Sequence, residues 1–255
     1  MADIHGMYDE YMQMLEKIHF GEDDYLYVLG DVIDRGKDGI RLLQDMMQRS
    51  NVTLLPGNHE DMMLKVVTLP EMAGEEYERR MAHWSRNGGD VTAHSFFSCL
   101  NYKEQAKMIA YLEGCPLFLP DVRVGGRSYY LVHACPDMYG LTKGMEHSPV
   151  TLGTLSDYPK NKVEEIKKEL LWTRPEGTEH MPDEVTVVFG HTPTIHYQGN
   201  LPMTCWYGNN MINIDCGCAY LACGRREGRL GCLRLGDGQE YYIGRDDGES
   251  FPGFV

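Results

Sequence analysis

The chain has 255 residues, of which 42% are hydrophobic and 24% charged, so its composition excludes collagen-like and disordered proteins. Asp and Glu total 38 against 24 for Lys and Arg, which gives a formal net charge of −14. Nucleic acid and anionic membrane surfaces repel such a chain, and the sequence contains no apolar run of about 18 residues that would cross a bilayer. We therefore expect neither nucleic acid nor a membrane as a partner.

The N-terminal residues and the cysteines bear on the compartment. The sequence does not start with the basic and apolar regions of a signal peptide. Its 8 cysteines are then expected to be free, mostly buried thiols of a cytoplasmic protein. Cys216, Cys218 and Cys223 lack the paired spacing of a structural zinc site. The sequence leaves the oligomeric state open.

The first third of the chain alternates between helix and strand patterns. Apolar residues recur at helical spacing over residues 8–18, 40–47 and 62–67, and short apolar runs at 25–29 and 51–55 predict strands. A β-α-β-α order implies parallel strands and an α/β class. Because ligands bind at the carboxyl ends of such strands, Asp31, Asp34, Asn58 and His59 should converge.

Asp3 and His5 resemble another strand-end loop, but only Met1 and Ala2 precede them. The first strand of the expected unit is therefore predicted to be missing. Fraying at the start of the chain is the alternative reading for Asp3 and His5, and it would weaken any site that uses them.

The pattern changes between about residues 70 and 127, where helical stretches at 75–83 and 103–112 predict a mostly helical cap. A strand follows at 128–132, a helix at 163–172, and strands at 185–189, 211–214, 230–235 and 240–243. These later strands predict a second, largely antiparallel sheet. We expect residues 1–255 to form a single catalytic domain with this cap as an insert.

Five short segments carry Asp, Asn and His at predicted strand ends or at the chain start: Asp3–Gly6, Gly30–Gly36, Gly57–Glu60, Leu131–Ala134 and Gly190–Pro193. In this order they resemble the calcineurin-like metallophosphoesterases, in particular the phosphoprotein phosphatase branch. The segments Trp84–Gly89, Leu170–Arg174 and Ile214–Gly217 extend the resemblance to bacterial and phage serine/threonine phosphatases and to symmetrical bis(5'-nucleosyl)-tetraphosphatases. The resemblance implies a two-sheet β-sandwich flanked by helices.

The resemblance also implies a site for two metal ions, Mn, Fe or Zn. Asp3, His5 and Asp31 would hold one ion, and Asp31, Asn58, His133 and His191 the other, with Asp31 as the bridge. A pair of cations suits phosphate ester hydrolysis, since it supplies a nucleophilic water at neutral pH and cancels charge on the phosphoryl oxygens. Local positive charge at the metals would then admit an anionic substrate to an acidic protein.

The implied reaction is direct attack of a metal-bridging hydroxide, without a phosphoenzyme. His59 would protonate the leaving group, Asp34 would hold its other ring nitrogen, and Arg35 and Arg174 would bind phosphate together with Asn58. Glu60 has a simpler reading, as an acidic residue at the start of a helix. Asp215 is either a residue that orients a metal-bound histidine or a structural hydrogen-bond acceptor.

Three functions stay open at this point. The first is a phosphomonoesterase that acts on phosphoserine or phosphothreonine in proteins, or on small phosphoesters. The second is a dinucleoside tetraphosphate hydrolase, and the third is a non-catalytic module that binds phosphorylated ligands. Cys135, beside His133, is either a redox-sensitive thiol or an inert packing residue.

Overall fold

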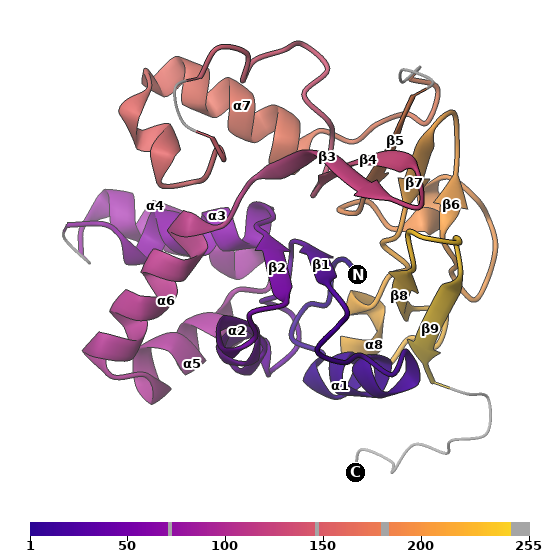
Figure 1. Cartoon of the computed structure of the whole chain (residues 1–255). Helices are drawn as coiled ribbons and strands as arrows, with labels where there is room; N and C mark the ends of the chain where they lie inside the picture. Colours follow the sequence, from indigo (N-terminus) through magenta and orange to yellow (C-terminus); the bar gives the residue numbers. More distant parts are fainter. Residues whose placement is uncertain (71–72, 146–147, 180–183, 246–255) are drawn as a thin grey trace, which may run out of the picture.

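The computed structural model describes residues 1–70, 73–145, 148–179 and 184–245 (Figure 1). Its first part follows the predicted alternation of helix and strand. Strands β1 and β2 pair in parallel, with Leu26 opposite Val52. The elements are α1 (Tyr8–Lys17), β1 (Leu26–Leu29), α2 (Gly39–Gln48), β2 (Val52–Leu55) and α3 (Asn58–Val67).

The first strand was predicted to be missing, and residues 1–3 run alongside β1 in its place. The amino group of Met1 donates to the carbonyl of Tyr27 at 3.0 Å, and the amide of Leu29 donates to the carbonyl of Met1 at 2.8 Å, as in a parallel pair. Among the described residues no assigned strand precedes α1. The pairing nevertheless holds Asp3 and His5 in the interior, where they are 2% and 1% exposed. They are therefore not frayed.

A group of helices follows: α4 (Glu75–Arg86), α5 (Asp90–Cys99) and α6 (Tyr102–Gly114). Asn101 caps α6, since its side chain accepts hydrogen bonds from the amides of Lys103 and Glu104. The predicted helical cap was too long at its end, because β3 (Phe118–Val124) is an edge strand that pairs antiparallel with β4 (Arg127–Val132). The helical part thus ends at Gly114.

The larger sheet has the strand order β3-β4-β5-β7-β6, with β5 at Val185–Phe189, β6 at Trp206–Tyr207 and β7 at Met211–Asn213. The prediction of a largely antiparallel second sheet was wrong, because β4, β5 and β7 run parallel. The connection from β4 to β5 is long enough to return to the same edge of the sheet, and it contains a short 3-10 helix (Thr154–Asp157) and α7 (Lys160–Trp172). Parallel pairing places the ends of β4 and β5 together.

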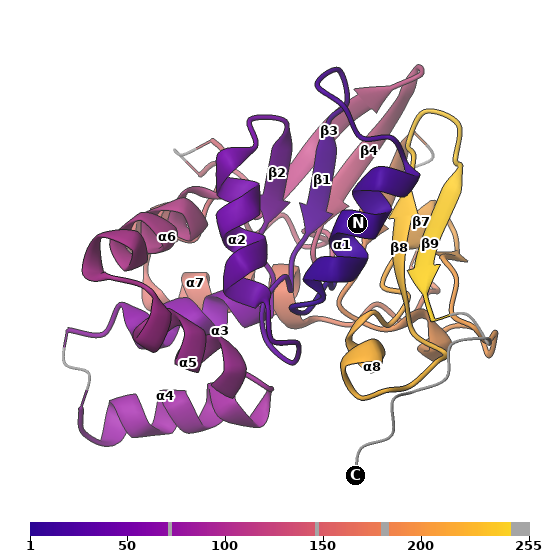
Figure 2. The same ribbon diagram turned by 90° about the horizontal axis from the view of Figure 1, so that it is seen from below.

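The last elements are a second short 3-10 helix (Thr194–His196), α8 (Ala219–Ala222), β8 (Arg229–Leu233) and β9 (Glu240–Gly244). Strands β8 and β9 form an antiparallel pair. Figures 1 and 2 place the N-terminus between β1 and β8, with α1 alongside. No helix in the described part of the chain is both long and apolar enough to cross a membrane.

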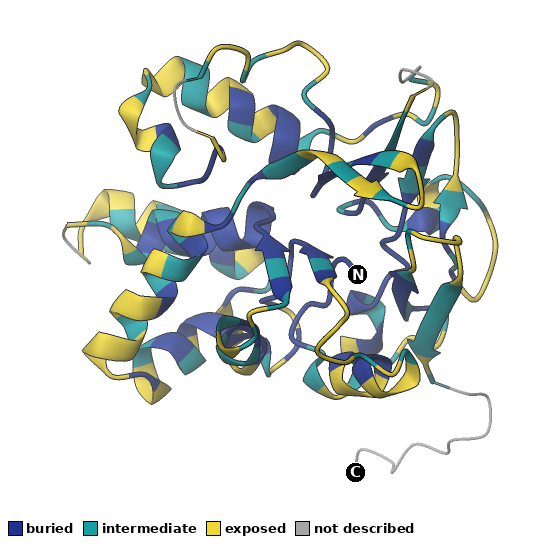
Figure 3. Ribbon diagram, in the orientation of Figure 1, coloured by how far each residue is buried: buried dark blue, intermediate teal, exposed yellow. Residues whose placement is uncertain are grey.

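The two sheet layers pack against each other through buried apolar side chains. Leu29 of β1 and Leu55 of β2 share a cluster with Tyr129 and Leu131 of β4 and Val188 of β5. This is the predicted sandwich, with helices on its outer side. Figure 3 shows α3 buried along most of its length, so the residues at its start lie inside the protein rather than on a surface turn.

Candidate metal centre

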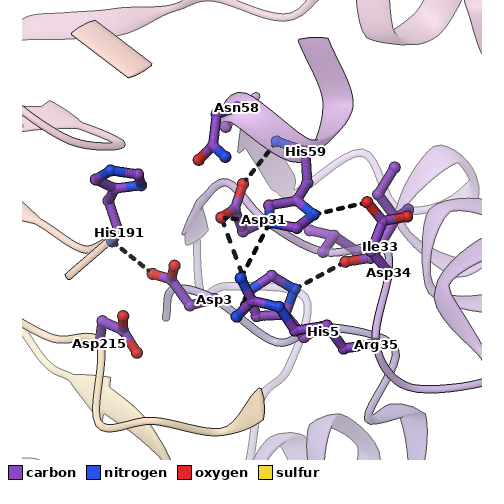
Figure 4. A network of polar contacts seen from close by, with 12 residues as sticks. Asp3, His5, Asp31, Ile33, Asp34, Arg35, Asn58, His59, His191 and Asp215 are labelled. Carbon is purple, nitrogen blue, oxygen red and sulfur yellow. Dashed lines mark hydrogen bonds and ion pairs between the residues drawn. The ribbon is translucent and has the colours of Figure 1, made fainter. Parts of the chain in front are cut away.

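The candidate site residues lie where strands end. Asp31, Asp34 and Arg35 follow β1, His133 follows β4 and His191 follows β5. Two more residues, Asn58 and His59, are the first residues of α3, directly beyond the end of β2. Figure 4 shows Asp31 in the middle of this group, with His5, His59 and Arg35 on one side and His191 and Asp3 on the other.

Asp31 belongs to two groups of potential ligands, one with His5 and His59 and one with His133 and His191. Its Oδ2 lies 3.7 Å from Nε2 of His5 and 3.8 Å from Nε2 of His59. Its Oδ1 lies 3.5 Å from Nε2 of His133. A carboxylate whose two oxygens face two sets of imidazoles has the geometry of a bridging ligand.

The histidine rings present lone pairs to the centre of the site. Nδ1 of His5 donates to the carbonyl of Ile33 at 2.9 Å, and Nδ1 of His133 donates to the carbonyl of Leu29 at 2.8 Å. A carbonyl only accepts, so in each neutral ring Nε2 is left without a proton. In His133 this Nε2 lies 3.0 Å from Oδ1 of Asn58. Both atoms are then acceptors, and a cation bound between them would stabilise this arrangement.

Two further observations fit bound cations. Both ring nitrogens of His191 are buried and have no hydrogen-bond partner among the described residues. Burial together with the nearby carboxylates of Asp215 and Asp31 raises the pKa of Asp3 well above its usual value. Crowded carboxylates and an imidazole without a partner both fit a bound cation, and this mixture of O and N donors suits Mn, Fe or Zn.

Asp3 lies outside the two compact groups of potential ligands. The sequence grouped Asp3 with His5 and Asp31, whereas the compact group in the structure contains His5, Asp31 and His59. The Asp3 carboxylate instead accepts a hydrogen bond from the amide of His191 at 3.0 Å, and Figure 4 shows it between the His191 backbone and Asp31. It lies on the side of the second group.

His59 and Asp34 form a buried pair, with Nδ1 of His59 2.6 Å from Oδ2 of Asp34. Burial opposes protonation of His59, but the charge of Asp31 and the bond to Asp34 outweigh it and raise the pKa of His59. The exposed guanidinium of Arg35 reaches Nε2 of both His5 and His59, at 2.9 Å and 3.2 Å. Arg174 is exposed just beyond α7 and makes no side-chain hydrogen bond to the candidate ligands described here.

The backbone around the site is held in an unusual conformation. Asp3, His5, Asp31, Asp34, Arg35 and His191 all have φ between 48° and 70°, in the left-handed region that residues other than glycine seldom adopt. Such strain persists only where the surroundings impose it, and it concentrates at functional sites. The shared conformation supports reading these residues as one site.

Glu60 does more than the sequence suggested. Its fully buried carboxylate accepts hydrogen bonds from the amides of Gly57, Asp31, Val32 and Ile33, at 2.7 to 3.3 Å. It therefore ties the loop after β1 to the start of α3. The bond to Gly57 is the capping interaction made by the third residue of a helix. This capping pattern is the only part of the role of Glu60 that the local sequence indicates.

The remaining sequence hypotheses resolve as follows. Oδ1 of Asp215 accepts from the amide of Gly217 at 2.9 Å, so the structural reading of Asp215 is the one that the geometry supports. Burial and the neighbouring Glu169 raise the pKa of the Cys135 thiol, which favours an inert packing residue. Among the described residues no potential metal group includes Cys216, Cys218 or Cys223.

Comparisons with known proteins agree with this geometry. The family model for calcineurin-like phosphoesterases matches residues 1–214. A serine/threonine-protein phosphatase 1 of Salmonella typhimurium is 26% identical over 209 residues, which cover 76% of this chain and 77% of that protein. A symmetrical bis(5'-nucleosyl)-tetraphosphatase of Buchnera aphidicola is 34% identical over 68 residues, but these are only 26% of this chain and 25% of that protein.

Solved structures share the fold. A putative diadenosine tetraphosphatase superposes with a TM-score of 0.58 over 97% of this chain and 92% of that chain, at 17% identity. A cold-active protein-tyrosine phosphatase of a Shewanella species gives 0.52 over 94% and 78%, at 18% identity. With the family match covering most of the sequence and the site built from its motifs, the chain belongs to the calcineurin-like phosphoesterases.

Proposed function

We propose that this protein is a hydrolase of phosphomonoesters that uses two metal ions, with phosphoserine or phosphothreonine in proteins as its substrates. The observation that carries the proposal is the position of Asp31, whose two carboxylate oxygens face two separate groups of histidines. A pair of bound cations supplies an activated water and neutralises the phosphoryl oxygens. In this proposal the whole chain is one catalytic domain, and α4, α5 and α6 form its cap.

The ligands in this proposal are Asp3, His5, Asp31, Asn58, His133 and His191. His59 is the general acid, because it lies beside Asp31, has a raised pKa and is held by Asp34 through its other nitrogen. Arg35 extends from the strand-end loop into the same space, where its fork of donors matches phosphate geometry. Arg174, which is exposed just beyond α7, is the second phosphate-binding arginine in this proposal.

A second candidate is hydrolysis of dinucleoside tetraphosphates at the same site. It is favoured by the similarity to the Buchnera tetraphosphatase and to the putative diadenosine tetraphosphatase structure. The longer match to the Salmonella phosphatase favours phosphomonoesters. The two reactions require the same metal centre and differ in the surfaces around it.

The deciding experiment compares kcat/KM for a phosphoserine peptide, p-nitrophenyl phosphate and diadenosine tetraphosphate, each with added Mn²⁺. We expect the phosphopeptide to be preferred over the dinucleotide. A clear preference for the dinucleotide would replace the first candidate with the second. Absence of turnover on all three by protein shown to contain two metals per chain would contradict both.

A further inference from the structure

We propose that Trp84 is a positioning residue that holds Asp34 in the orientation in which it supports His59. The indole Nε1 of Trp84 donates to Oδ2 of Asp34 at 2.8 Å. The same oxygen takes the hydrogen bond from Nδ1 of His59 at 2.6 Å. This inference rests on the proposed role of His59 and adds to it a residue from the helical part of the chain, 50 positions from Asp34.

The indole matters because Asp34 has few other restraints. Its Oδ1 is buried and has no hydrogen-bond partner in the described residues, so both donors converge on one oxygen. Asp34 and Trp84 are both 0% exposed, and water does not compete for this contact. Without the indole N–H, the carboxylate is free to rotate about its last bond and to carry Nδ1 of His59 with it.

The segment that contains Trp84 also supports the backbone of Asp34. The amide of Asp34 donates to Oγ1 of Thr92 at 2.9 Å, and the amide of Arg35 donates to the carbonyl of Gly88 at 3.0 Å. Asp34 and Arg35 have φ of 70° and 68°, a strained pair that requires such support. Residues 84–92 therefore hold this turn through hydrogen bonds to the main chain of Asp34 and Arg35 and to the side chain of Asp34.

Local packing directs the indole toward Asp34. A Cβ at Gly89 would lie 2.4 Å from Cδ1 and Nε1 of Trp84, so only glycine allows the chain to pass this close to the ring. Trp84 itself lies in the last turn of α4. In the sequence, the Trp84–Gly89 segment stood out only through its resemblance to known phosphatases. In the structure, its physical role is to place the indole N–H against Asp34.

In the reaction, the oxygen of a water molecule forms a new bond to phosphorus and gives up one proton to solvent, while the P–O bond to the leaving group breaks. The electron pair of the broken bond goes to the leaving oxygen, which takes a proton from Nε2 of His59. Nδ1 keeps its own proton, which stays hydrogen-bonded to Asp34. Two donors on Oδ2, from Trp84 and from His59, fix the direction of the Asp34 carboxylate. Trp84 thereby helps to keep His59 aligned before the proton is given up.

The test replaces the indole by a ring without the N–H, in Trp84→Phe, with Trp206→Phe as the matched control because Trp206 stacks on Tyr197 outside the site. Two substrates are used: p-nitrophenyl phosphate, whose leaving group needs little protonation, and an alkyl phosphate, whose leaving group needs it. We expect Trp84→Phe to lower kcat for the alkyl phosphate roughly 10- to 100-fold. The KM values, the metal content and kcat for p-nitrophenyl phosphate should stay within about threefold, which is under 1 kcal/mol.

His59→Asn in the same assay separates the two claims. If His59→Asn loses activity selectively on the alkyl phosphate and Trp84→Phe does not, the proposal for Trp84 is wrong and the role of His59 stands. If His59→Asn shows no leaving-group dependence, the proposed function of His59 fails first. If Trp84→Phe lowers kcat equally on both substrates, Trp84 has a structural role only and the proposal is wrong.

An NMR measurement covers the case in which Trp84→Phe does not fold. In the intact protein, the Nε1–H resonance of Trp84 should lie downfield of that of Trp206, as expected for a bond to a carboxylate. Asp34→Asn should move the Trp84 resonance upfield and leave that of Trp206 in place. A Trp84 resonance that does not respond to Asp34→Asn would overturn the proposal.

Discussion

Nδ1 of His59 and Oδ2 of Asp34 lie 2.6 Å apart in a part of the protein from which water is excluded, since the two side chains are 1% and 0% exposed. The pairing leaves Nε2 of His59 directed to the space that Asp31 and Arg35 also face. A histidine held in this way at one nitrogen presents the other to a leaving group. The chemistry proposed for the site depends on that orientation.

The first prediction concerns His59. His59→Asn should lower kcat on an alkyl phosphate by about 10²–10⁴-fold, the usual contribution of a general acid, while the protein keeps its metals. Steady-state kinetics with elemental analysis of the same sample checks both parts. Full activity of the variant on this poor leaving group would show that His59 is not the acid.

A second prediction uses the shared position of Asp31. Asp31→Asn should lower binding of both metal ions, because its two oxygens face both groups of histidines. His5→Asn, which changes one group only, should lower the metal content by about one ion per chain. Elemental analysis after dialysis against Mn²⁺ distinguishes the two variants, and the same loss from both would argue against the bridge.

Glu60 gives a third prediction, on stability. Glu60→Gln places an amide group opposite backbone N–H donors that now face a carboxylate. The lost charge-assisted bonds should cost about 2–3 kcal/mol and lower the melting temperature by about 5–10 °C. Thermal unfolding followed by circular dichroism measures this shift. Glu78→Gln, at an exposed position of α4, is the control, and an equal shift in both variants would remove the special role of Glu60.

The sequence predicted the elements that carry the site because their patterns are local. The β1–α2–β2–α3 order follows from short apolar runs and helical periodicity, and the structure confirms it within a few residues. Strand β3 was not predicted because Pro120, Asp121 and Arg123 interrupt its apolar pattern. An edge strand tolerates such residues and a central strand does not. Parallel pairing of β4 and β5 was missed because it depends on the path of a long connection.

The contacts that organise the site were harder to foresee. Asp31 and the histidines proposed as metal ligands belong to motifs that stand out in the sequence. Trp84 and Thr92 act on Asp34 across 50 and 58 residues, and Glu60 binds the amide of Asp31 from 29 residues away. No local pattern encodes such distances, since they arise only when the helical segment folds back onto the strand ends.

A fourth prediction concerns pH and the metal-free protein. Burial, together with the charge of Asp31, raises the pKa of Asp215 to about 7, although Gly217 and the arginines act in the opposite direction. A carboxyl group with a raised folded-state pKa stabilises the protein at low pH, and this stability is lost as the pH rises through about 7. The histidines with lowered pKa, His5 and His191, act in the opposite sense, but only below about 6.5.

Between pH 6.5 and 8 the trend is therefore set by the carboxylates with raised pKa and by His59, whose raised pKa also makes its contribution to stability fall as the pH rises. In EDTA, the wild-type melting temperature should fall over this range, and Asp215→Asn should be more stable than wild type at pH 8 and closer to it at pH 5. Added Mn²⁺ should reduce the difference at pH 8, because a cation compensates the crowded negative charge. A variant that is no more stable than wild type at pH 8 in EDTA would contradict the raised pKa.

The last prediction concerns the glycine that leaves room for the bridging carboxylate. A Cβ at Gly57 would lie 2.2 Å from Oδ1 of Asp31 and 2.7 Å from Cε1 of His133. The backbone of Gly57 is extended, with φ of −98°, so alanine fits the main chain and the contact alone is at stake. Gly57→Ala should therefore push Asp31 away from His133 and reduce metal content and kcat together.

Gly114→Ala is the matched control, because nothing lies within 4 Å of its added Cβ. If Gly57→Ala binds metal and turns over substrate as well as the Gly114→Ala control does, the close approach of Gly57 to Asp31 is not what sets the position of the carboxylate.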